Sequence, residues 1–128
     1  SLAKARLELD TIPKADFKGI IGCEVYVARR RMFNREKAMG DYSGYHLILL
    51  AKNMQGYKNL IKIVSKAYTE GSYGRPRTDR VELEKYHEGL VCCSACIGGE
   101  IPRRILDNEF KAAEAAIEVL EPIINTLK

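Results

Sequence analysis

Short apolar runs alternate with polar segments along the chain, and three of the runs have the length of β-strands. The first, residues 19–28 (GIIGCEVYVA), is rich in β-branched residues and is apolar on both alternating sides except at Glu24. The others occupy residues 45–52 (YHLILLAK) and 90–95. Apolar residues on both alternating sides are typical of a strand that is covered on both faces. The pattern therefore predicts a sheet of about three strands within a larger core.

Helical spacing of apolar residues is found between and after these runs. Asn53 can cap a helix that ends at Gly71, because apolar residues recur three and four positions apart between them. Strands that alternate with helices indicate the α/β class. Further helices are predicted over residues 2–10, from Thr78 or Asp79 to Tyr86, over residues 101–106, and from a cap at Asn108 to Pro122.

Two polar segments rich in arginine are predicted to be loops. Residues 29–44 contain three consecutive arginines and end in turn-forming residues, and residues 71–78 contain two more around a proline. Residues 1–80 carry 16 Lys/Arg against 8 Asp/Glu, whereas residues 81–128 carry 5 against 9. A basic first part suggests a surface that faces phosphate. The arginines predicted to contact nucleic acid, or else a neighbouring protein domain, are Arg29, Arg30, Arg31, Arg75, Arg77 and Arg80.

The 128 residues, 46% hydrophobic and 30% charged, have the size and composition of one domain. The longest apolar run, residues 46–51, is far shorter than the ~20 residues of a membrane helix. The first ten residues alternate charge with Leu and Ala and so do not resemble a signal peptide. We therefore expect a cytoplasmic protein.

Three residues offer ligands for a metal ion. Glu24 lies inside an apolar strand, where a carboxylate must be paired, protonated or bound to metal. If the first two strands form a hairpin, His46 returns to within reach of Glu24, whereas parallel pairing could leave them apart. Cys96 follows the third strand, where side chains emerge from an α/β sheet. Oxygen, nitrogen and sulfur donors together suit zinc better than magnesium or calcium.

Each of these residues also has a structural explanation. Glu24 can be a satisfied carboxylate, and His46 a hydrogen-bonded core residue. Cys93 and Cys96 form a C-x-x-C pattern that a dithiol redox site would use, although no Trp or Pro frames it. Cys92 and Cys93 are interpreted most simply as small core residues.

Five stretches of the chain follow one another in the order of a known family: IIGCEVYVA at 20–28, YHLILLAK at 45–52, GYKNLIKIVSKAYTEG at 56–71, RPRTD at 75–79 and EGLVCCSACIGGEIP at 88–102. They resemble the PHP (polymerase and histidinol phosphatase) domain of bacterial DNA polymerase III alpha subunits. The resemblance covers roughly residues 18–118 and implies a partial, distorted β/α barrel with metal ions at one end. By motif match, Glu24, His46 and Cys96 occupy ligand positions of that metal cluster.

The resemblance also implies a function for the intact parent protein. That parent would be a DNA-directed DNA polymerase, with a possible zinc-dependent phosphoesterase or 3′–5′ exonuclease site in this domain. Its partners would be DNA and the other domains and subunits of the replication machinery. A non-catalytic module that contacts DNA or polymerase domains is the alternative.

Departures from the family pattern limit what this chain can do alone. The family's His-x-His pair cannot be present, because His46 and His87 are the only histidines. Residues 1–17 diverge from the pattern, with Ser1 and Leu2 interpreted as a cloning junction, and residues 18–128 are interpreted as the partial PHP domain. We expect the chain to be inactive, to hold at most one ion weakly, and to pair with a second copy through uncovered strand edges and apolar faces.

Overall fold

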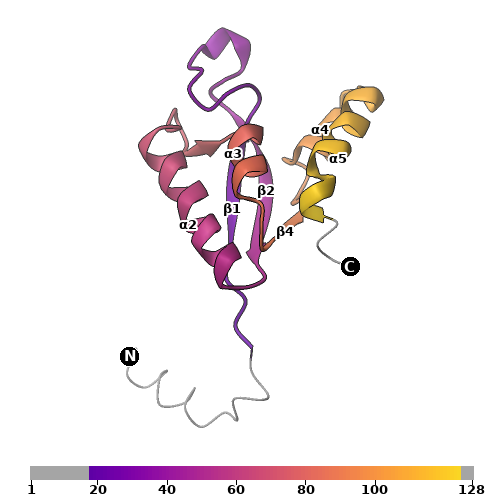
Figure 1. The fold of residues 1–128 in the computed structure, drawn as a ribbon. Helices are drawn as coiled ribbons and strands as arrows, with labels where there is room; N and C mark the ends of the chain where they lie inside the picture. Colours follow the sequence, from indigo (N-terminus) through magenta and orange to yellow (C-terminus); the bar gives the residue numbers. More distant parts are fainter. Residues whose placement is uncertain (1–17, 125–128) are drawn as a thin grey trace, which may run out of the picture.

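A four-stranded mixed sheet forms the centre of the chain in a computed structural model that describes residues 18–124 (Figure 1). The strand order is β3-β1-β2-β4, with β1–β2 and β2–β4 antiparallel and β1–β3 parallel. The elements are β1 (Gly22–Ala28), the 3-10 helix η1 (Lys37–Met39), β2 (Gly44–Ala51), α2 (Met54–Thr69), β3 (Arg77–Thr78), α3 (Arg80–Tyr86), β4 (Leu90–Cys93), α4 (Glu100–Leu106) and α5 (Phe110–Ile124).

The three predicted strands are confirmed, and β3 is an addition within a predicted loop. Two residues are too few to show an alternating pattern, so β3 could not be found from the sequence. Asn53 caps α2 as predicted, because its side chain accepts from the Gly56 N–H. Of the two predicted starts of α3, Thr78 and Asp79, it is Asp79 that caps the helix, by accepting from the Glu82 N–H. The helix predicted over residues 2–10 lies outside the described residues.

The prediction for the last helix is wrong at both ends. Asn108 adopts a left-handed conformation with φ of 59° instead of capping α5, which begins two residues later at Phe110. The helix also continues through Pro122 to Ile124. A proline so close to the helix end removes one backbone hydrogen bond without ending the helix.

Within residues 18–124, helices cover one face of the sheet only. Val25, Leu47 and Leu49 point to this face and pack with Leu60 and Ile63 of α2 in one core cluster. The cluster also takes in Leu83 of α3 and Leu120 of α5. The prediction that the strands are covered on both faces is therefore wrong for the described residues.

The opposite side of the sheet is hereafter the open face. Strand register places Glu24, Ile48 and Cys93 in one row across it, and Gly22, Leu50 and Val91 in the next. Ile48, Leu50 and Val91 are only half-buried there, and Cys93 is exposed. These apolar side chains explain why the sequence suggested two covered faces. The exposure of Cys93 corrects its interpretation as a core residue.

The sheet does not close on itself within residues 18–124. The class is therefore α/β as predicted, with a mixed open sheet, and a barrel is not confirmed. None of the helices in this part of the chain has the length and apolar character that a membrane crossing needs.

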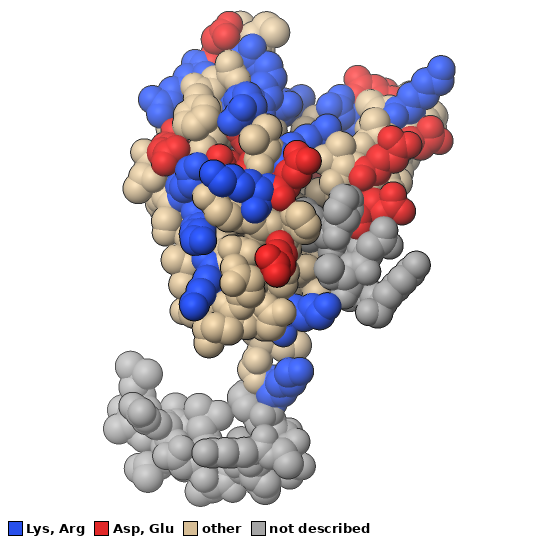
Figure 2. All heavy atoms as spheres, in the orientation of Figure 1, with Lys and Arg blue, Asp and Glu red and all other residues tan. Residues whose placement is uncertain are grey.

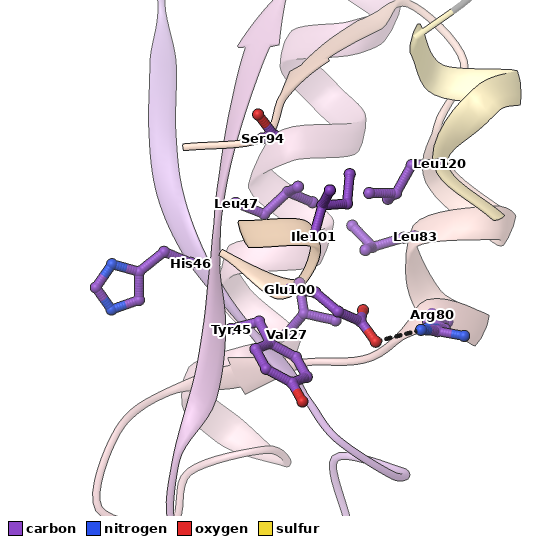
Figure 3. Close-up of a pocket in the computed structure, with 10 residues that line it drawn as sticks. All are labelled: Val27, Tyr45, His46, Leu47, Arg80, Leu83, Ser94, Glu100, Ile101 and Leu120. Carbon is purple, nitrogen blue, oxygen red and sulfur yellow. Dashed lines mark hydrogen bonds and ion pairs between the residues drawn. The ribbon is translucent and has the colours of Figure 1, made fainter. Parts of the chain in front are cut away.

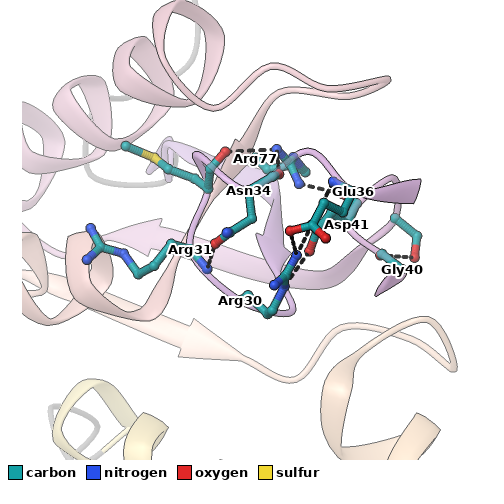
Figure 4. A network of polar contacts seen from close by, with 9 residues as sticks. Arg30, Arg31, Asn34, Glu36, Gly40, Asp41 and Arg77 are labelled. Atoms are coloured by element: carbon teal, nitrogen blue, oxygen red, sulfur yellow. Dashed lines mark hydrogen bonds and ion pairs between the residues drawn. The ribbon is translucent and has the colours of Figure 1, made fainter. Parts of the chain in front are cut away.

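A buried arginine organises the long loop between β1 and β2 (Figure 4). The Arg77 side chain is fully buried and donates to the carbonyl oxygens of Met32, Asn34, Asp41 and Gly71. These hydrogen bonds attach the long loop to β3 and so hold the ends of the loop beside the sheet.

A second buried group connects the same loop to a helix. The Asp79 carboxylate accepts hydrogen bonds from Arg31 Nε at 2.7 Å and from the Met32 N–H at 2.9 Å, while it caps α3. Burial alone would raise the pKa of Asp79, but these hydrogen bonds outweigh it and hold the pKa below its ordinary value.

Candidate metal centre

Glu24 and His46 meet on the open face. In the β1–β2 hairpin Glu24 pairs with Ile48 and Tyr26 pairs with His46, so the two residues are diagonal neighbours. His46 Nδ1 lies 2.9 Å from Glu24 Oε1. The Tyr26 ring packs edge-on against the imidazole, with 5.0 Å between centroids. The hairpin is the arrangement that the sequence required to bring these side chains together.

The turn after β4 brings Cys96 to the same place. Because β4 runs antiparallel to β2, the chain beyond Cys93 continues toward His46. There the His46 N–H donates to the Gly98 carbonyl at 3.0 Å, which fixes the turn to the edge of β2. Cys96 Sγ lies 3.4 Å from His46 Nδ1 and accepts from the Gly98 N–H.

The three side chains can offer one ligand atom each within 4.8 Å of one another. Zinc bonds of about 2.0–2.3 Å at tetrahedral angles would separate ligand atoms by about 3.3–3.6 Å. The nitrogen–sulfur distance of 3.4 Å fits this range, and the nitrogen–oxygen distance of 2.9 Å needs only a small adjustment. The Glu24 side chain is 48% exposed and that of His46 30%, so an ion could enter from solvent.

A small, partly enclosed cavity lies on the helical side of the sheet. Leu47, Leu83 and Leu120 line this cavity together with the Arg80–Glu100 ion pair. Figure 3 shows the His46 ring on the opposite side of β2 from that pair. His46 is also among the residues that line this cavity, so it lies between the core cavity and the candidate metal centre.

The other cysteines show no arrangement of this kind. All four cysteines are free thiols. Cys92 is buried in the core. Its burial, and to a smaller extent the charge of the nearby Cys93, raise the pKa of its thiol to about 12. Cys92 is therefore protonated near neutral pH and acts as a small core residue, as predicted. Burial and then Glu24 also raise the pKa of Cys23.

The six predicted nucleic-acid-binding arginines have different surroundings. Arg77 is the clear correction, because its buried guanidinium donates to protein carbonyls and cannot reach a phosphate. Arg30 pairs with Glu36 and Asp41, Arg31 with Asp79, and Arg80 with Glu100. Arg29 and Arg75 instead stack on tyrosine rings.

Charge is unevenly spread over the surface shown in Figure 2. Basic side chains gather over α2 and the long loop, and acidic ones over the side formed by α5. The contrast between the first and second parts of the sequence is therefore also a contrast in space.

Several residues around the centre were missed by sequence reasoning. Gly98 packs against the His46 ring so closely that an added Cβ would lie 3.1 Å from its atoms. The Gly98–Gly99 pair after Cys96 was a signal for a tight turn, but nothing in the sequence indicated that His46 was its neighbour. Arg103 of α4 and Tyr26 also lie beside His46 in one hollow.

Comparison with known proteins places the chain in a family. The model of the PHP domain matches residues 4–127. The chain is 55% identical over 104 residues to the DNA polymerase III subunit alpha of Borreliella burgdorferi. The aligned residues make up 81% of the chain and 9% of that protein. The corresponding subunit of Thermus aquaticus is 46% identical over 101 residues, covering 78% of the chain and 8% of that protein.

A third relative agrees with these two. The DNA polymerase III subunit alpha of Treponema pallidum is 46% identical over 97 residues, covering 76% of the chain and 8% of that protein. The chain thus spans less than a tenth of the length of each of these three relatives. With the family model matched over nearly all of its residues, the chain belongs to the PHP domain family, in the form that occurs in DNA polymerase III alpha subunits.

Proposed function

We propose that this chain is part of a replicative DNA polymerase alpha subunit and that Glu24, His46 and Cys96 help to bind divalent metal in the complete domain. The proposed metal is zinc, and the proposed reaction is phosphoester hydrolysis, including 3′–5′ removal of nucleotides from DNA. The single observation that carries the proposal is the meeting of three different donors from separate segments at one point of the open face.

The donor set supports zinc over harder ions. Magnesium and calcium prefer oxygen ligands, whereas an imidazole nitrogen and a thiolate favour zinc. When bound, such an ion polarises a phosphoryl oxygen and lowers the pKa of bound water so that hydroxide forms near pH 7. The chain's own contribution is to orient the donors: Tyr26 holds the His46 ring edge-on, and the Gly98 N–H directs the Cys96 sulfur.

The same donor set argues against activity of the chain by itself. A catalytic zinc commonly uses three protein ligands, and phosphoester hydrolysis in this proposal needs two or three ions. Within residues 18–124, Glu24, His46 and Cys96 form the only cluster of metal-ligand side chains. Three donors suffice for one exposed ion, so we propose that the isolated chain binds one ion weakly and does not hydrolyse DNA.

Cobalt titration tests the ligand set. Bound cobalt gives intense thiolate-to-metal absorption only when a cysteine sulfur coordinates it. We expect this absorption with the unaltered chain and with Cys93→Ser, and its loss with Cys96→Ser. Equal loss in both variants, or survival in Cys96→Ser, would contradict the assignment. Cys93 is the matched control because it is exposed and only three residues away.

A nuclease assay tests the activity of the isolated chain. The chain is incubated with zinc or manganese and a 3′-labelled single-stranded oligonucleotide. We expect no release of nucleotides beyond that caused by the free metal ion. Release that disappears in His46→Ala would show that the chain is active by itself and would overturn the proposed inactivity.

The open face favours a second candidate function, an interaction module. Ile48, Leu50 and Val91 form a half-exposed apolar patch beside the candidate metal centre. A face of this kind can be covered by another polymerase domain or by a second copy of the chain. Such contacts are compatible with a metal role in the complete protein.

A further inference from the structure

A hollow of about 270 Å³ opens directly beside His46, next to the candidate metal centre. Three separate segments bring an arginine to its wall: Arg29 follows β1, Arg75 precedes β3, and Arg103 belongs to α4. These segments are far apart in the sequence, so the concentration of guanidinium groups is a product of the fold.

In the part of the chain that the structure describes, no carboxylate lines this hollow. Among the described residues, Arg29, Arg75 and Arg103 also form no ion pair with Asp or Glu, in contrast to Arg30, Arg31 and Arg80. Three like charges around one concave space repel one another unless an anion lies between them. The structure thus separates the arginines neutralised by the protein from those available to a ligand.

Aromatic rings hold two of these arginines in place. The Arg29 guanidinium lies 5.0 Å from the centroid of the Tyr45 ring, and that of Arg75 lies 4.7 Å from the centroid of the Tyr26 ring. Arg75 also donates to the Tyr26 hydroxyl. Stacking through the guanidinium face leaves N–H groups at its edge available, and these match the oxygens of a phosphate.

The size of the hollow and the residues at its rim indicate which chemical groups are attached to the anion. Its volume is just below the roughly 300 Å³ at which pockets for drug-sized ligands begin, which suits a phosphate with its sugar. Tyr42 at the wall is 55% exposed and offers a ring on which a base can stack. His46 lies at the wall as well, so a phosphate here is adjacent to the metal donors.

We propose that this hollow binds one nucleotide of a single strand, with Arg29, Arg75 and Arg103 as donors to its phosphate and Tyr42 as the platform for its base. The inference rests on the proposed function, in which the neighbouring cluster acts on phosphoesters. It adds to that function the side chains that would bind the substrate, through contacts that need no metal ion.

Calorimetric titration with thymidine 5′-monophosphate in the presence of EDTA tests the proposal. We expect the nucleotide to bind, inorganic phosphate to bind more weakly, and thymidine not to bind. Arg75→Gln and Arg103→Gln should each weaken nucleotide binding about tenfold, as expected for loss of a charge-assisted hydrogen bond. Arg35→Gln is the control, since Arg35 is exposed, lies outside the hollow and bonds the Glu70 carbonyl.

Thermal unfolding of each variant checks that it is folded before its affinity is compared. The proposal is overturned if thymidine binds as well as its monophosphate, if the nucleotide does not bind, or if Arg35→Gln weakens binding as much as Arg75→Gln. Because the titration contains no metal ion, its result is separate from the cobalt result. Nucleotide binding without any metal binding would contradict the proposed function and leave this inference intact.

Discussion

The imidazole of His46 meets the carboxylate of Glu24 diagonally across two antiparallel strands, with 2.9 Å between Nδ1 and Oε1. Both side chains lie on the open face because the hairpin register pairs Glu24 with Ile48 and His46 with Tyr26. Side chains alternate between faces along a strand, so a slip of one residue would turn His46 into the core. The candidate centre therefore depends on the register of the hairpin and on the turn after β4.

That turn leads to a prediction at Gly98. A methyl group at this position would lie 3.1 Å from the His46 ring, so the ring must move by a few tenths of an ångström. We expect Gly98→Ala to weaken zinc binding about tenfold, as changes in groups that orient metal ligands do. The melting temperature should change little, because Gly98 is only partly buried. Competition with a chromophoric chelator measures the affinity, and unchanged affinity would show that the contact does not orient His46.

Acid should remove the stabilisation that Asp79 provides. Its folded pKa lies below the ordinary value of 3.8, so its contribution is present above about pH 4 and is lost as the pH falls through the folded pKa. We expect Asp79→Asn to lower the free energy of unfolding by about 1–3 kcal/mol at pH 7, because it weakens the bonds to Arg31 and Met32.

Urea unfolding at pH 7 and pH 3 tests this expectation. The difference between the unaltered chain and Asp79→Asn should narrow at the lower pH, because the Asp79 carboxylate binds a proton more readily in the unfolded chain than in the folded one. Comparing the two proteins cancels the titration of other groups, including Asp41, whose pKa is lowered mainly by its hydrogen bond with Arg30. A difference that stays constant with pH would show that the charge of Asp79 does not stabilise the fold.

Arg77 should tolerate no replacement, even by lysine. Its planar side chain donates to carbonyls in several directions within a buried space, and an ammonium group cannot reproduce that geometry. We expect Arg77→Lys to lower the free energy of unfolding by about 2–4 kcal/mol, because buried carbonyl oxygens lose their donors. Chemical denaturation measures the loss. Arg35→Lys serves as the exposed control and should change stability by less than about 0.5 kcal/mol.

The open face predicts self-association in the absence of other partners. If two copies cover the patch formed by Ile48, Leu50 and Val91, sedimentation at increasing concentration should show a monomer–dimer equilibrium. Leu50→Lys places a charge in that patch and should shift the protein to monomer, whereas the exposed Lys58→Glu on α2 should not. A monomer at all concentrations, or equal effects of both variants, would contradict pairing through this face.

The sequence was informative where local chemistry decides structure, and less so where distant segments meet. The strand runs and the Asn53 cap depend on neighbouring residues, and they were predicted correctly. The start of α3 was predicted at Thr78 or Asp79, and Asp79 caps it. The hairpin was one of two alternatives, because pairing direction depends on the whole sheet. Apolar residues on the open face gave the same pattern as a buried strand, so the strands were predicted to be covered on both faces.

The arginines show the same limit most clearly. Arg75 and Arg77 flank one proline and look alike in the sequence, yet Arg75 is exposed on a tyrosine ring and Arg77 is fully buried. Only the packing of the long loop against β3 separates them. The sequence did not indicate a role for Arg103, because Arg75 and Arg29, the other arginines of the hollow, lie nearly 30 and 75 residues away in the sequence.

Zinc content per chain tests the central claim most directly. Equilibrium dialysis followed by elemental analysis, on the unaltered chain and on His46→Ala, gives both the number of ions and their affinity. The account predicts one weakly held ion per chain that is lost in His46→Ala, without nuclease activity. Two or more tightly held ions with nuclease activity would contradict it, and so would zinc binding that does not depend on His46.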